Sequence, residues 1–263
     1  MKQKIIFFDI DGTIYHYKHG MPKDTYESIC RLKEKGHIPV ICTGRTKCMI
    51  YPGHMSPGFE YIIAGAGTHI VVQNREIYLS EMKKGRVNEL QEICRNSGMI
   101  EIGEGKDYLY LGKGSEKLEG ELKIIRDSYI KEIGEQIKVF DSCEKRLSKM
   151  SAFLVPGCDM EQVINQTKDA YHLVNHKGLL LEFIPKGEGK AQGIERMIQE
   201  LGMRREDTIS FGDSHNDYDM LEYTNISVAM GNGDEEIKQM ADYVTAPFDQ
   251  GGVTMALKKL NLI

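Results

Sequence analysis

Short apolar runs recur along the chain, and each one stops abruptly at a polar or glycine-rich turn. The runs cover residues 5–8, 38–42, 179–184, 208–211 and 226–230. Apolar runs without a regular polar alternation are typical of strands that are buried on both faces of a sheet. Such strands occur mainly in α/β proteins, where helices cover the sheet on both sides.

Helical patterns follow or separate these runs. Residues 23–35 carry apolar side chains at helical spacing between Pro22 and Gly36, which suit the start and the end of a helix. Residues 191–201 repeat this pattern and end before Gly202. Alternating strands and helices predict a parallel sheet, and ligands bind such sheets at the carboxyl ends of the strands. We therefore expect the polar turns after the runs to form one site.

The middle of the chain has a different pattern, in which helices and short strands follow one another without such turns. The predicted helices cover 86–95 and 160–171, and the predicted strands cover 108–111, 152–155 and 172–175. A hairpin over residues 71–80, with Asn74-Arg75 at its centre, leads into this region. The pattern predicts an inserted α+β domain.

The spacing of the polar turns also indicates an insertion. Asp11 and Thr43 are 32 residues apart, which leaves room for one helix and one strand, whereas Thr43 and Lys190 are 147 residues apart. A strand–helix return needs roughly 30 to 40 residues, so about 100 remain for a second domain. We predict a discontinuous core at residues 1–81 and 184–263 and an inserted domain at residues 82–183.

Composition limits the classes of partner and compartment. The 263 residues include 34 Lys and Arg and 39 Asp and Glu, and a net charge of −5 argues against a surface that coats nucleic acid. The apolar run at residues 5–8 is too short for a signal peptide or a membrane-spanning helix. Six cysteines without a C-x-x-C pair are typical of reduced thiols. We therefore predict a cytoplasmic protein that binds neither membrane nor nucleic acid.

Asp9 and Asp11 follow the first apolar run. Residues two apart in an extended segment point to the same side, so both carboxylates can face one ligand. For an arbitrary D-x-D-G sequence a simple turn is the usual explanation. Here the preceding run is wholly apolar, and burying acids beside it is costly without a cation or protons. Asp213 and Asp217 supply further acids, and carboxylates without His or Cys partners suit Mg²⁺.

Two other turns carry hydrogen-bond donors. Thr43-Gly44-Arg45 offers a hydroxyl and backbone N–H groups at an expected helix start, and Lys190 offers an ammonium group at another. Together such groups form a cradle for phosphate. Taken singly, Thr43 is more typical of a helix cap and Lys190 of a solvated charge. Asp219, close to Asp217, is expected to be a solvated residue in the first turn of a helix.

With these residues assembled, the chain resembles the haloacid dehalogenase superfamily, in particular its Cof-type phosphatases. The resemblance rests on four motifs in order: Asp9-Ile10-Asp11-Gly12-Thr13, Thr43-Gly44-Arg45, Lys190, and Gly212-Asp213-Ser214-His215-Asn216-Asp217 followed by Met220-Leu221. It implies a Rossmannoid parallel-sheet core with an inserted α+β cap domain, hence an α/β fold. It also implies a Mg²⁺-dependent phosphatase of small phosphorylated metabolites, with sugar phosphates favoured over pyridoxal or flavin phosphates.

The resemblance assigns a role to each site residue. Asp9 attacks phosphorus and forms an aspartyl-phosphate, and Asp11 acts as acid and then as base. Mg²⁺ is held by Asp9, the backbone carbonyl of Asp11, Asp213 and Asp217.

The remaining residues act on the phosphoryl group or the substrate. Thr43 and Lys190 stabilise the phosphoryl oxygens in the transition state. Gly44, Arg45 and Asn216 complete phosphate and substrate binding or orient the metal ligands.

Two other functions stay open at this point. A phosphohexomutase of the same fold would return the phosphoryl group to the bound sugar, and the motifs do not separate it from a phosphatase. A non-catalytic phosphate-binding or receiver-like module would use Asp9 as a simple phosphoacceptor. The acid at Asp11 and the long insertion argue against that module, because a passive acceptor needs neither an acid nor a lid.

Overall fold

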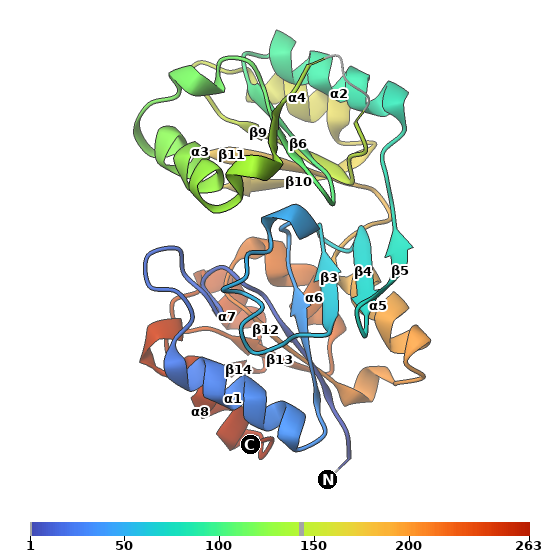
Figure 1. Ribbon diagram of the computed structural model, residues 1–263, viewed down its shortest axis with the longest axis vertical. Coiled ribbons are helices and arrows are strands. Elements are labelled where there is room, and N and C mark those ends of the chain that lie inside the picture. Colours follow the sequence, from blue (N-terminus) through green and yellow to red (C-terminus); the bar gives the residue numbers. More distant parts are fainter. Residues whose placement is uncertain (1, 142–144) are drawn as a thin grey trace. The chain divides into compact units, whose positions relative to one another are not determined.

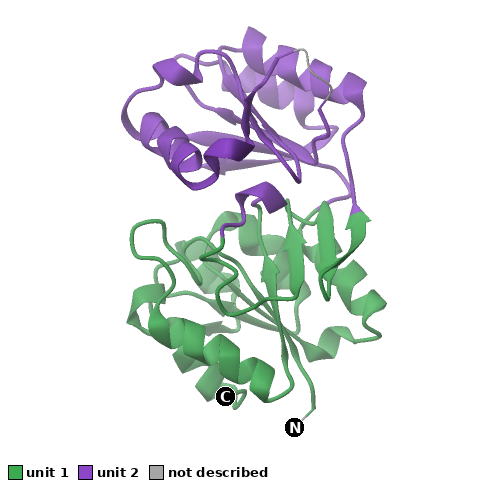
Figure 2. Ribbon diagram, viewed as in Figure 1, with its two compact units in different colours: residues 1–44, 52–78, 189–263 green, residues 45–51, 79–188 purple. Residues whose placement is uncertain are grey.

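The computed structural model describes residues 2–141 and 145–263, which divide into two compact units (Figure 1). The first unit comprises residues 1–44, 52–78 and 189–263, and the second comprises residues 45–51 and 79–188 (Figure 2). The segment 45–51 was expected in the core, but it belongs to the second unit because Cys48, Met49 and Tyr51 pack into that unit's apolar cluster. The limits 1–81 with 184–263 and 82–183 otherwise stay a prediction of domain boundaries.

The first unit is built on an eight-stranded sheet with the order β14-β13-β12-β1-β2-β3-β4-β5. The strands are β1 (Ile5–Phe8), β2 (Ile38–Cys42), β3 (Tyr61–Ala64), β4 (His69–Val72), β5 (Arg75–Leu79), β12 (Thr208–Gly212), β13 (Ile226–Ala229) and β14 (Tyr243–Val244). The pairs from β14 through β1 to β3 are parallel, and β4 returns antiparallel to β3. This arrangement confirms the predicted α/β class and the parallel-sheet core.

Helices cover this sheet. They are α1 (Lys23–Glu34), α5 (Lys190–Glu200), α6 (Tyr218–Tyr223), α7 (Glu235–Met240) and α8 (Gly252–Lys259). All four residues of β1 are fully buried, as a strand between two covered faces requires. Ile194 of α5 and Met220 of α6 pack with Ile5 and Phe7 of β1, while α1 contacts β2 and α8.

The second unit is built on a six-stranded sheet with the order β10-β11-β9-β6-β7-β8. The strands are β6 (Ile100–Glu104), β7 (Leu109–Leu111), β8 (Ile137–Val139), β9 (Lys149–Phe153), β10 (Tyr171–His176) and β11 (Leu180–Pro185), and the helices are α2 (Lys84–Asn96), α3 (Gly120–Ile133) and α4 (Met160–Thr167). All pairs are antiparallel except β7 with β8. The prediction of an inserted α+β unit is confirmed, although α3, β6 and β8 were not predicted.

The run at residues 179–184 corrects one sequence prediction. Its apolar pattern was grouped with those of the parallel strands that lead into the site, although most of the run lies within the predicted inserted domain 82–183. The run forms β11 and pairs antiparallel with β10 and β9 in the second sheet. Leu181 and Phe183 face an apolar cluster, and Glu182 on the alternate side is also buried. A central antiparallel strand that is buried on both faces therefore has the same apolar pattern as a parallel one.

The two faces of the second sheet are covered differently. On one face Met150 and Phe183 pack with Val87 of α2 and Val163 of α4. On the other face Ile102 and Phe153 belong to a cluster with Leu122 of α3 and with Met49 of the 3₁₀ helix Lys47–Met49. The segment 45–51 thus supplies part of the cover of this sheet.

A buried ionic cluster lies on this second sheet. The ammonium group of Lys149 forms ion pairs with Glu182 and, at 3.2 Å, with Glu104. The hydroxyl of Ser151 donates to Glu104, and Nε2 of His176 lies 3.1 Å from Glu182. Lys149 is opposite Glu104, and Ser151 is opposite Glu182, in the registers of β9 with β6 and β11. Cross-strand pairing therefore assembles the cluster.

Smaller sequence predictions can also be compared with the structure. The hairpin over residues 71–80 is confirmed, with Gln73 and Asn74 at positive φ between β4 and β5. Cys30, Cys42, Cys48, Cys94 and Cys158 are free thiols, and Cys143 lies outside the described residues.

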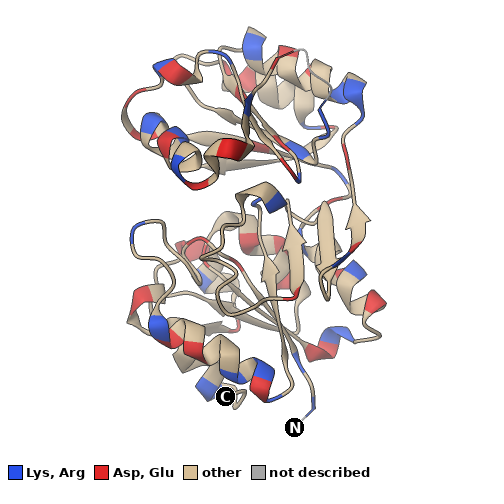
Figure 3. Cartoon of the chain, viewed as in Figure 1, with Lys and Arg blue, Asp and Glu red and all other residues tan. Residues whose placement is uncertain are grey.

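Charged groups and helix lengths also bear on the partners of the chain. Lys and Arg are interspersed with Asp and Glu along the helices of both units (Figure 3). In the described part of the chain, no helix combines the length and the apolar character that crossing a membrane demands. The cytoplasmic location stays a prediction.

Candidate active site

The site is built at the point where the strand order of the core sheet reverses. β1 lies between β12 and β2, and from β1 the chain first builds one side of the sheet and later the other. Asp9 directly follows β1, and Asp213 directly follows β12. The backbone N–H of Asp9 donates to the carbonyl of Phe211 at 3.0 Å, which holds the two strand ends in register. Such a switch point is where open α/β sheets bind ligands.

Lys190 is the centre of the buried ionic cluster in the first unit. It is the first residue of α5, and its side chain is 1% exposed. Its ammonium group donates to Oδ1 of Asp9 at 2.8 Å and to Oδ1 of Asp217 at 2.5 Å. The structure therefore brings together three of the predicted site residues that are far apart in sequence.

Asp213 and Asp217 are fixed by their own loop. Oδ2 of Asp217 accepts from the backbone N–H groups of Asp213 at 2.9 Å and Ser214 at 3.2 Å. Oδ1 of Asp213 accepts from the hydroxyl of Thr13 at 3.1 Å. Gly12 has φ of +85°, and a Cβ there would overlap the carboxylate of Asp213. A glycine is therefore needed at this position for both conformation and space.

Burial and mutual repulsion shift the acid–base properties of the cluster. Desolvation and the neighbouring charge of Asp217 raise the pKa of Asp9 to about 7, against the lowering effect of Lys190. The same causes raise the pKa of Asp213 well above its usual range. Burial alone would lower the pKa of Lys190, but the carboxylates of Asp217 and Asp9 raise it well above its ordinary value. One buried ammonium thus does not balance the buried carboxylates.

The carboxylates can hold a metal ion. Asp9, Asp213 and Asp217 each offer one oxygen, and these oxygens lie within 4.8 Å of one another. A donor set made of carboxylate oxygens suits a hard divalent cation rather than a soft metal. The unbalanced negative charge described above also favours a cation here. The residues present therefore fit a bound divalent ion.

Other predicted site residues have contacts of their own. Asp11 is exposed and forms a bridge with Tyr15, and its charge also raises the pKa of Asp9, so it lies close enough to interact with Asp9. Asn216 accepts from the hydroxyl of Ser214 at 2.7 Å, so its side-chain oxygen is engaged within its own loop. Their roles stay predictions.

The turn at Thr43-Gly44-Arg45 differs from the expected helix start. Thr43 is buried, and its backbone N–H donates to the carbonyl of Ile63 at 2.9 Å, so that N–H serves the sheet rather than a ligand. Arg45 belongs to the second unit, where its guanidinium donates to the carbonyl of Met49 at 3.2 Å and stacks over Tyr51. The phosphate role of Thr43, Gly44 and Arg45 stays a prediction.

Three residues near the cluster were not assigned to the site by sequence reasoning. Thr13 holds Asp213, as described above, and Asn232 donates to the carbonyl of Gly12 at 2.9 Å. Asn232 follows the apolar run at residues 226–230. The expectation that polar turns after such runs form the site therefore also applies to Asn232.

Asp219 is the third of these residues, and the expectation that it is solvated was wrong. Its carboxylate accepts from the backbone N–H of Ala191 at 3.0 Å, and burial raises its pKa. It thereby caps the first turn of α5, which carries Lys190.

Comparison with known proteins identifies the family. The sequence profile of the haloacid dehalogenase-like hydrolases matches residues 6–257, and the chain belongs to this family. The Bacillus subtilis (strain 168) protein named "Putative phosphatase YkrA" is 29% identical over the whole of both chains. The 5-amino-6-(5-phospho-D-ribitylamino)uracil phosphatase YitU of the same organism is 26% identical, over 98% of this chain and 97% of its own.

Solved structures with a similar fold include members of the same superfamily. A hypothetical protein from Geobacillus kaustophilus HTA426 is 28% identical and covers both chains completely, with a TM-score of 0.83. A sugar phosphatase of subclass IIB in the haloacid dehalogenase superfamily is 27% identical and covers 99% of this chain and all of its own, with a TM-score of 0.84. The predicted resemblance is confirmed, and the chain is a hydrolase that acts on phosphate esters.

Proposed function

We propose that this chain is a Mg²⁺-dependent phosphatase that hydrolyses small phosphorylated metabolites through an aspartyl-phosphate at Asp9. The observation that carries the proposal is the convergence of Asp9, Asp213 and Asp217 around one buried ammonium group, that of Lys190. Three carboxylates and one cation leave a negative excess that a divalent cation and a phosphoryl group can share.

Asp9 is suited to act as the nucleophile. Asp9 is 3% exposed and directly follows a strand whose residues are fully buried, so its position is fixed. In the first step a carboxylate oxygen of Asp9 attacks phosphorus, and the bond from phosphorus to the ester oxygen breaks. The leaving oxygen takes a proton from the carboxyl group of Asp11 and departs as an alcohol.

The second step regenerates the enzyme. Water attacks the phosphorus of the aspartyl-phosphate, and Asp11, now a carboxylate, takes the proton from that water. The bond between phosphorus and the Asp9 oxygen breaks, which releases inorganic phosphate and free Asp9. The exposure of Asp11 supports this role, because an acid that serves both alcohol and water must be reachable from solvent.

The remaining groups position charge. Mg²⁺ would be held by Asp9, Asp213 and Asp217, together with the backbone carbonyl of Asp11, and it would neutralise negative charge on the carboxylate and phosphoryl oxygens. Lys190 holds Asp9 and Asp217 at fixed separations and supplies positive charge without any further reorganisation. Thr43 is proposed to donate its hydroxyl to a phosphoryl oxygen.

Sugar phosphates are the favoured substrates. Two relatives support this choice, since one is named a sugar phosphatase and YitU is named for a phosphoribityl compound. In both names the phosphate ester belongs to a polyhydroxylated carbon chain. We propose that this chain acts on esters of the same kind, released as free sugars or polyols.

The test is phosphate release from an aryl phosphate and then from a panel of phosphorylated metabolites, with Mg²⁺ or with a chelator. Asp9→Asn should lower kcat by about a thousandfold or more, since the nucleophile is removed while the side-chain shape is kept. Asp249→Asn, which changes an exposed acid of the same unit, is the matched control and should leave kcat unchanged. Full activity of Asp9→Asn, or equal activity with the chelator, would refute the proposal.

The same assay separates the open alternatives. A phosphohexomutase would convert one sugar phosphate into its isomer and release little phosphate. A non-catalytic module would retain phosphate on Asp9 after a single transfer. Steady release of phosphate without an activating bisphosphate is the outcome that we expect.

A further inference from the structure

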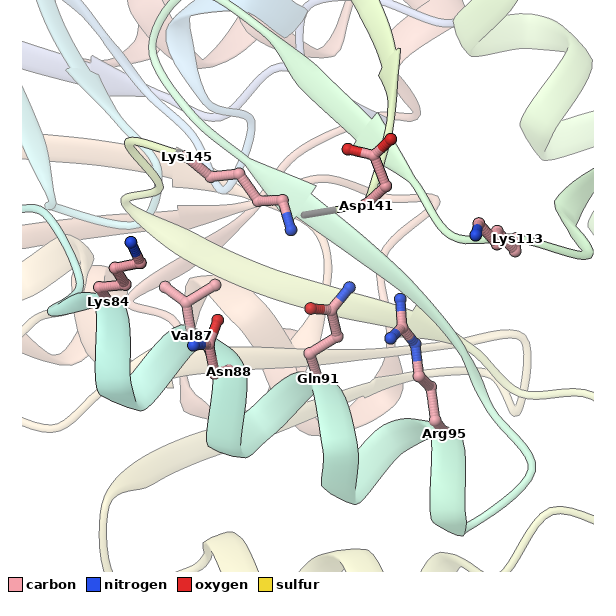
Figure 4. A pocket seen from close by; sticks show the side chains of 8 residues that line it. All are labelled: Lys84, Val87, Asn88, Gln91, Arg95, Lys113, Asp141 and Lys145. Carbon is pink, nitrogen blue, oxygen red and sulfur yellow. The ribbon is translucent and has the colours of Figure 1, made fainter. Parts of the chain in front are cut away.

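The second unit contains a cavity of about 500 Å³ beside α2. Its lining comes from α2, from the turn after β7, and from Asp141 and Lys145. Figure 4 shows the side chains of Gln91 and Arg95 extending from α2 into the same space toward which Lys145 points. None of these residues belongs to a sequence motif or to the acidic cluster of the first unit.

The lining is strongly basic. Among the described residues, Lys84, Arg95, Lys113 and Lys145 border the cavity together with one acid, Asp141. These four cations come from three separate segments of the chain, so they approach a common space from different directions. Separate cations around a concave space bind an anion better than the same charges on an open surface, because their fields act together on the ligand.

The basic groups at the base of the cavity are held in place. Nε of Arg95 donates to Oε1 of Glu101 at 2.8 Å, and Nη2 donates to the carbonyl of Phe140 at 3.2 Å. Gln91 donates to the same two acceptors, at 2.9 and 3.2 Å. Lys145 lies over the ring of Phe140, with 4.2 Å between Nζ and the ring centroid. Because these contacts fix the side chains before any ligand arrives, binding costs little ordering entropy.

The turn that carries Lys113 is fixed to the same base. The backbone N–H of Gly112 donates to the carbonyl of Glu101 at 2.8 Å. A Cβ at Gly112 would lie 2.7 Å from the carboxylate of Glu101, so a side chain there would push the turn away. Gly112 therefore lets the turn that carries Lys113 approach Glu101 closely.

Charge and size define the ligand. The described lining residues include four cations and one acid, Asp141, and the guanidinium of Arg95 is also paired with Glu101, so the described lining is basic overall. A cavity of about 500 Å³ is within the range of small-metabolite sites, roughly 300 to 1,000 Å³. We propose that this cavity binds the phosphate group of a small phosphorylated metabolite as a dianion. This binding site is independent of the function proposed for the first unit.

The experiment is an NMR titration of the full-length protein with inorganic phosphate as the probe, at a pH where phosphate is a dianion and at constant ionic strength. The side-chain amide of Gln91 and the backbone amide of Lys113 report on the cavity, while the amides of residues 9–13 report separately on the acidic cluster. We expect saturable shifts at Gln91 and Lys113.

The variants remove exposed charge so that folding is preserved. Lys84→Gln with Lys113→Gln should weaken phosphate binding at the cavity by roughly tenfold, since two charge-assisted contacts are lost. Lys123→Gln with Lys131→Gln, two exposed lysines of α3, makes the same change of net charge and should stay within about twofold of wild type. Arg95 is kept, because its removal would leave Glu101 buried without that partner.

Two results would overturn the proposal. The first is a lack of saturable shifts at Gln91 and Lys113 in the wild-type protein. The second is equal weakening by both double variants, which would show general charge screening instead of a defined site. Failure of the phosphatase assay would leave both readouts unchanged, because neither reports on Asp9.

Discussion

Each of the two units contains a buried lysine between two carboxylates. In the first unit Lys190 lies between Asp9 and Asp217, and in the second unit Lys149 lies between Glu104 and Glu182. The two lysine side chains are 1% and 2% exposed, so both clusters are removed from solvent. In isolation the two sets of ion pairs look alike.

Their surroundings differ in the balance of charge. The cluster of the first unit adds a third carboxylate, Asp213, whereas the cluster of the second unit adds the hydroxyl of Ser151 and the ring of His176. The carboxylates of the second cluster have hydrogen-bond or ion-pair partners among protein groups. In the first cluster burial, together with the neighbouring charge of Asp217, raises the pKa of Asp9 to about 7. A third carboxylate within one buried cluster therefore distinguishes the candidate cation site from the second cluster.

The largest expected effect on this difference comes from substituting each of the two buried lysines. Lys190→Gln and Lys149→Gln each leave buried carboxylates without their cation, so we expect each to lower the free energy of unfolding by about 3–5 kcal/mol without metal. Mg²⁺ should restore much of the loss in Lys190→Gln and none in Lys149→Gln. Urea unfolding with and without Mg²⁺ measures both effects. An equal response of the two variants to Mg²⁺ would contradict the comparison.

The pH dependence of stability should also differ between the clusters. The pKa of Asp9 is raised in the folded protein from 3.8 to about 7, so the folded state binds a proton more tightly than the unfolded state. Without metal, the free energy of unfolding should therefore fall as the pH rises from about 4 to about 7, by up to about 1.4 kcal/mol per unit for one proton.

The control for this pH effect is Asp9→Asn, which should flatten the slope. Asp213 shifts in the same direction, so some slope should remain in that variant. Glu182→Gln in the second unit should leave the contribution of the first unit unchanged. Urea-unfolding curves at several pH values measure this pH dependence. A free energy of unfolding that rises between pH 4 and 7 without metal would contradict the raised pKa of Asp9.

A smaller effect is expected at two glycines with the same backbone conformation. Gly12 has φ of +85° and Gly114 has φ of +95°, so alanine should cost each about 1–2 kcal/mol of backbone strain. Gly12→Ala also places a Cβ against the carboxylate of Asp213, so its Mg²⁺ affinity should fall by about tenfold or more. Calorimetric titration measures this affinity, and Gly114→Ala should keep it.

The smallest expected effect compares two aspartates that cap helices. Asp219 accepts from Ala191 at the start of α5, and Asp159 accepts from Gln162 at the start of α4. Substitution of either by Ala should cost roughly 0.5–2 kcal/mol of stability. Asp219→Ala should also lower kcat by about tenfold, since α5 carries Lys190, whereas Asp159→Ala should not. Equal kcat values in the two variants would show that the capping of α5 is purely structural.

The sequence predicts the first cluster better than the second for a physical reason. Asp9 and Asp213 each follow a continuous apolar run directly, so the contrast between buried strand and acid is visible in a few residues. The positions of such residues at strand ends also follow from the rules of parallel sheets. No such contrast marks Glu104, Lys149 or Glu182, because each lies within or at the end of a strand and finds its partners through cross-strand register.

The errors have related causes. The run at residues 179–184 was grouped with the parallel strands because burial on both faces erases the alternation that would identify an antiparallel strand. Asp219 looked solvated because its partner, the N–H of Ala191, is remote in sequence. The segment 45–51 was expected in the core, and its packing against the second sheet is a tertiary property that no local pattern reports.

Calorimetric titration of the chelator-treated protein with Mg²⁺ tests the difference between the two clusters most directly. We predict one Mg²⁺ per chain, loss of binding in Asp213→Asn, and wild-type affinity in Glu182→Gln. Binding that persists in Asp213→Asn, or that disappears in Glu182→Gln, would contradict the assignment of the cation to the first unit.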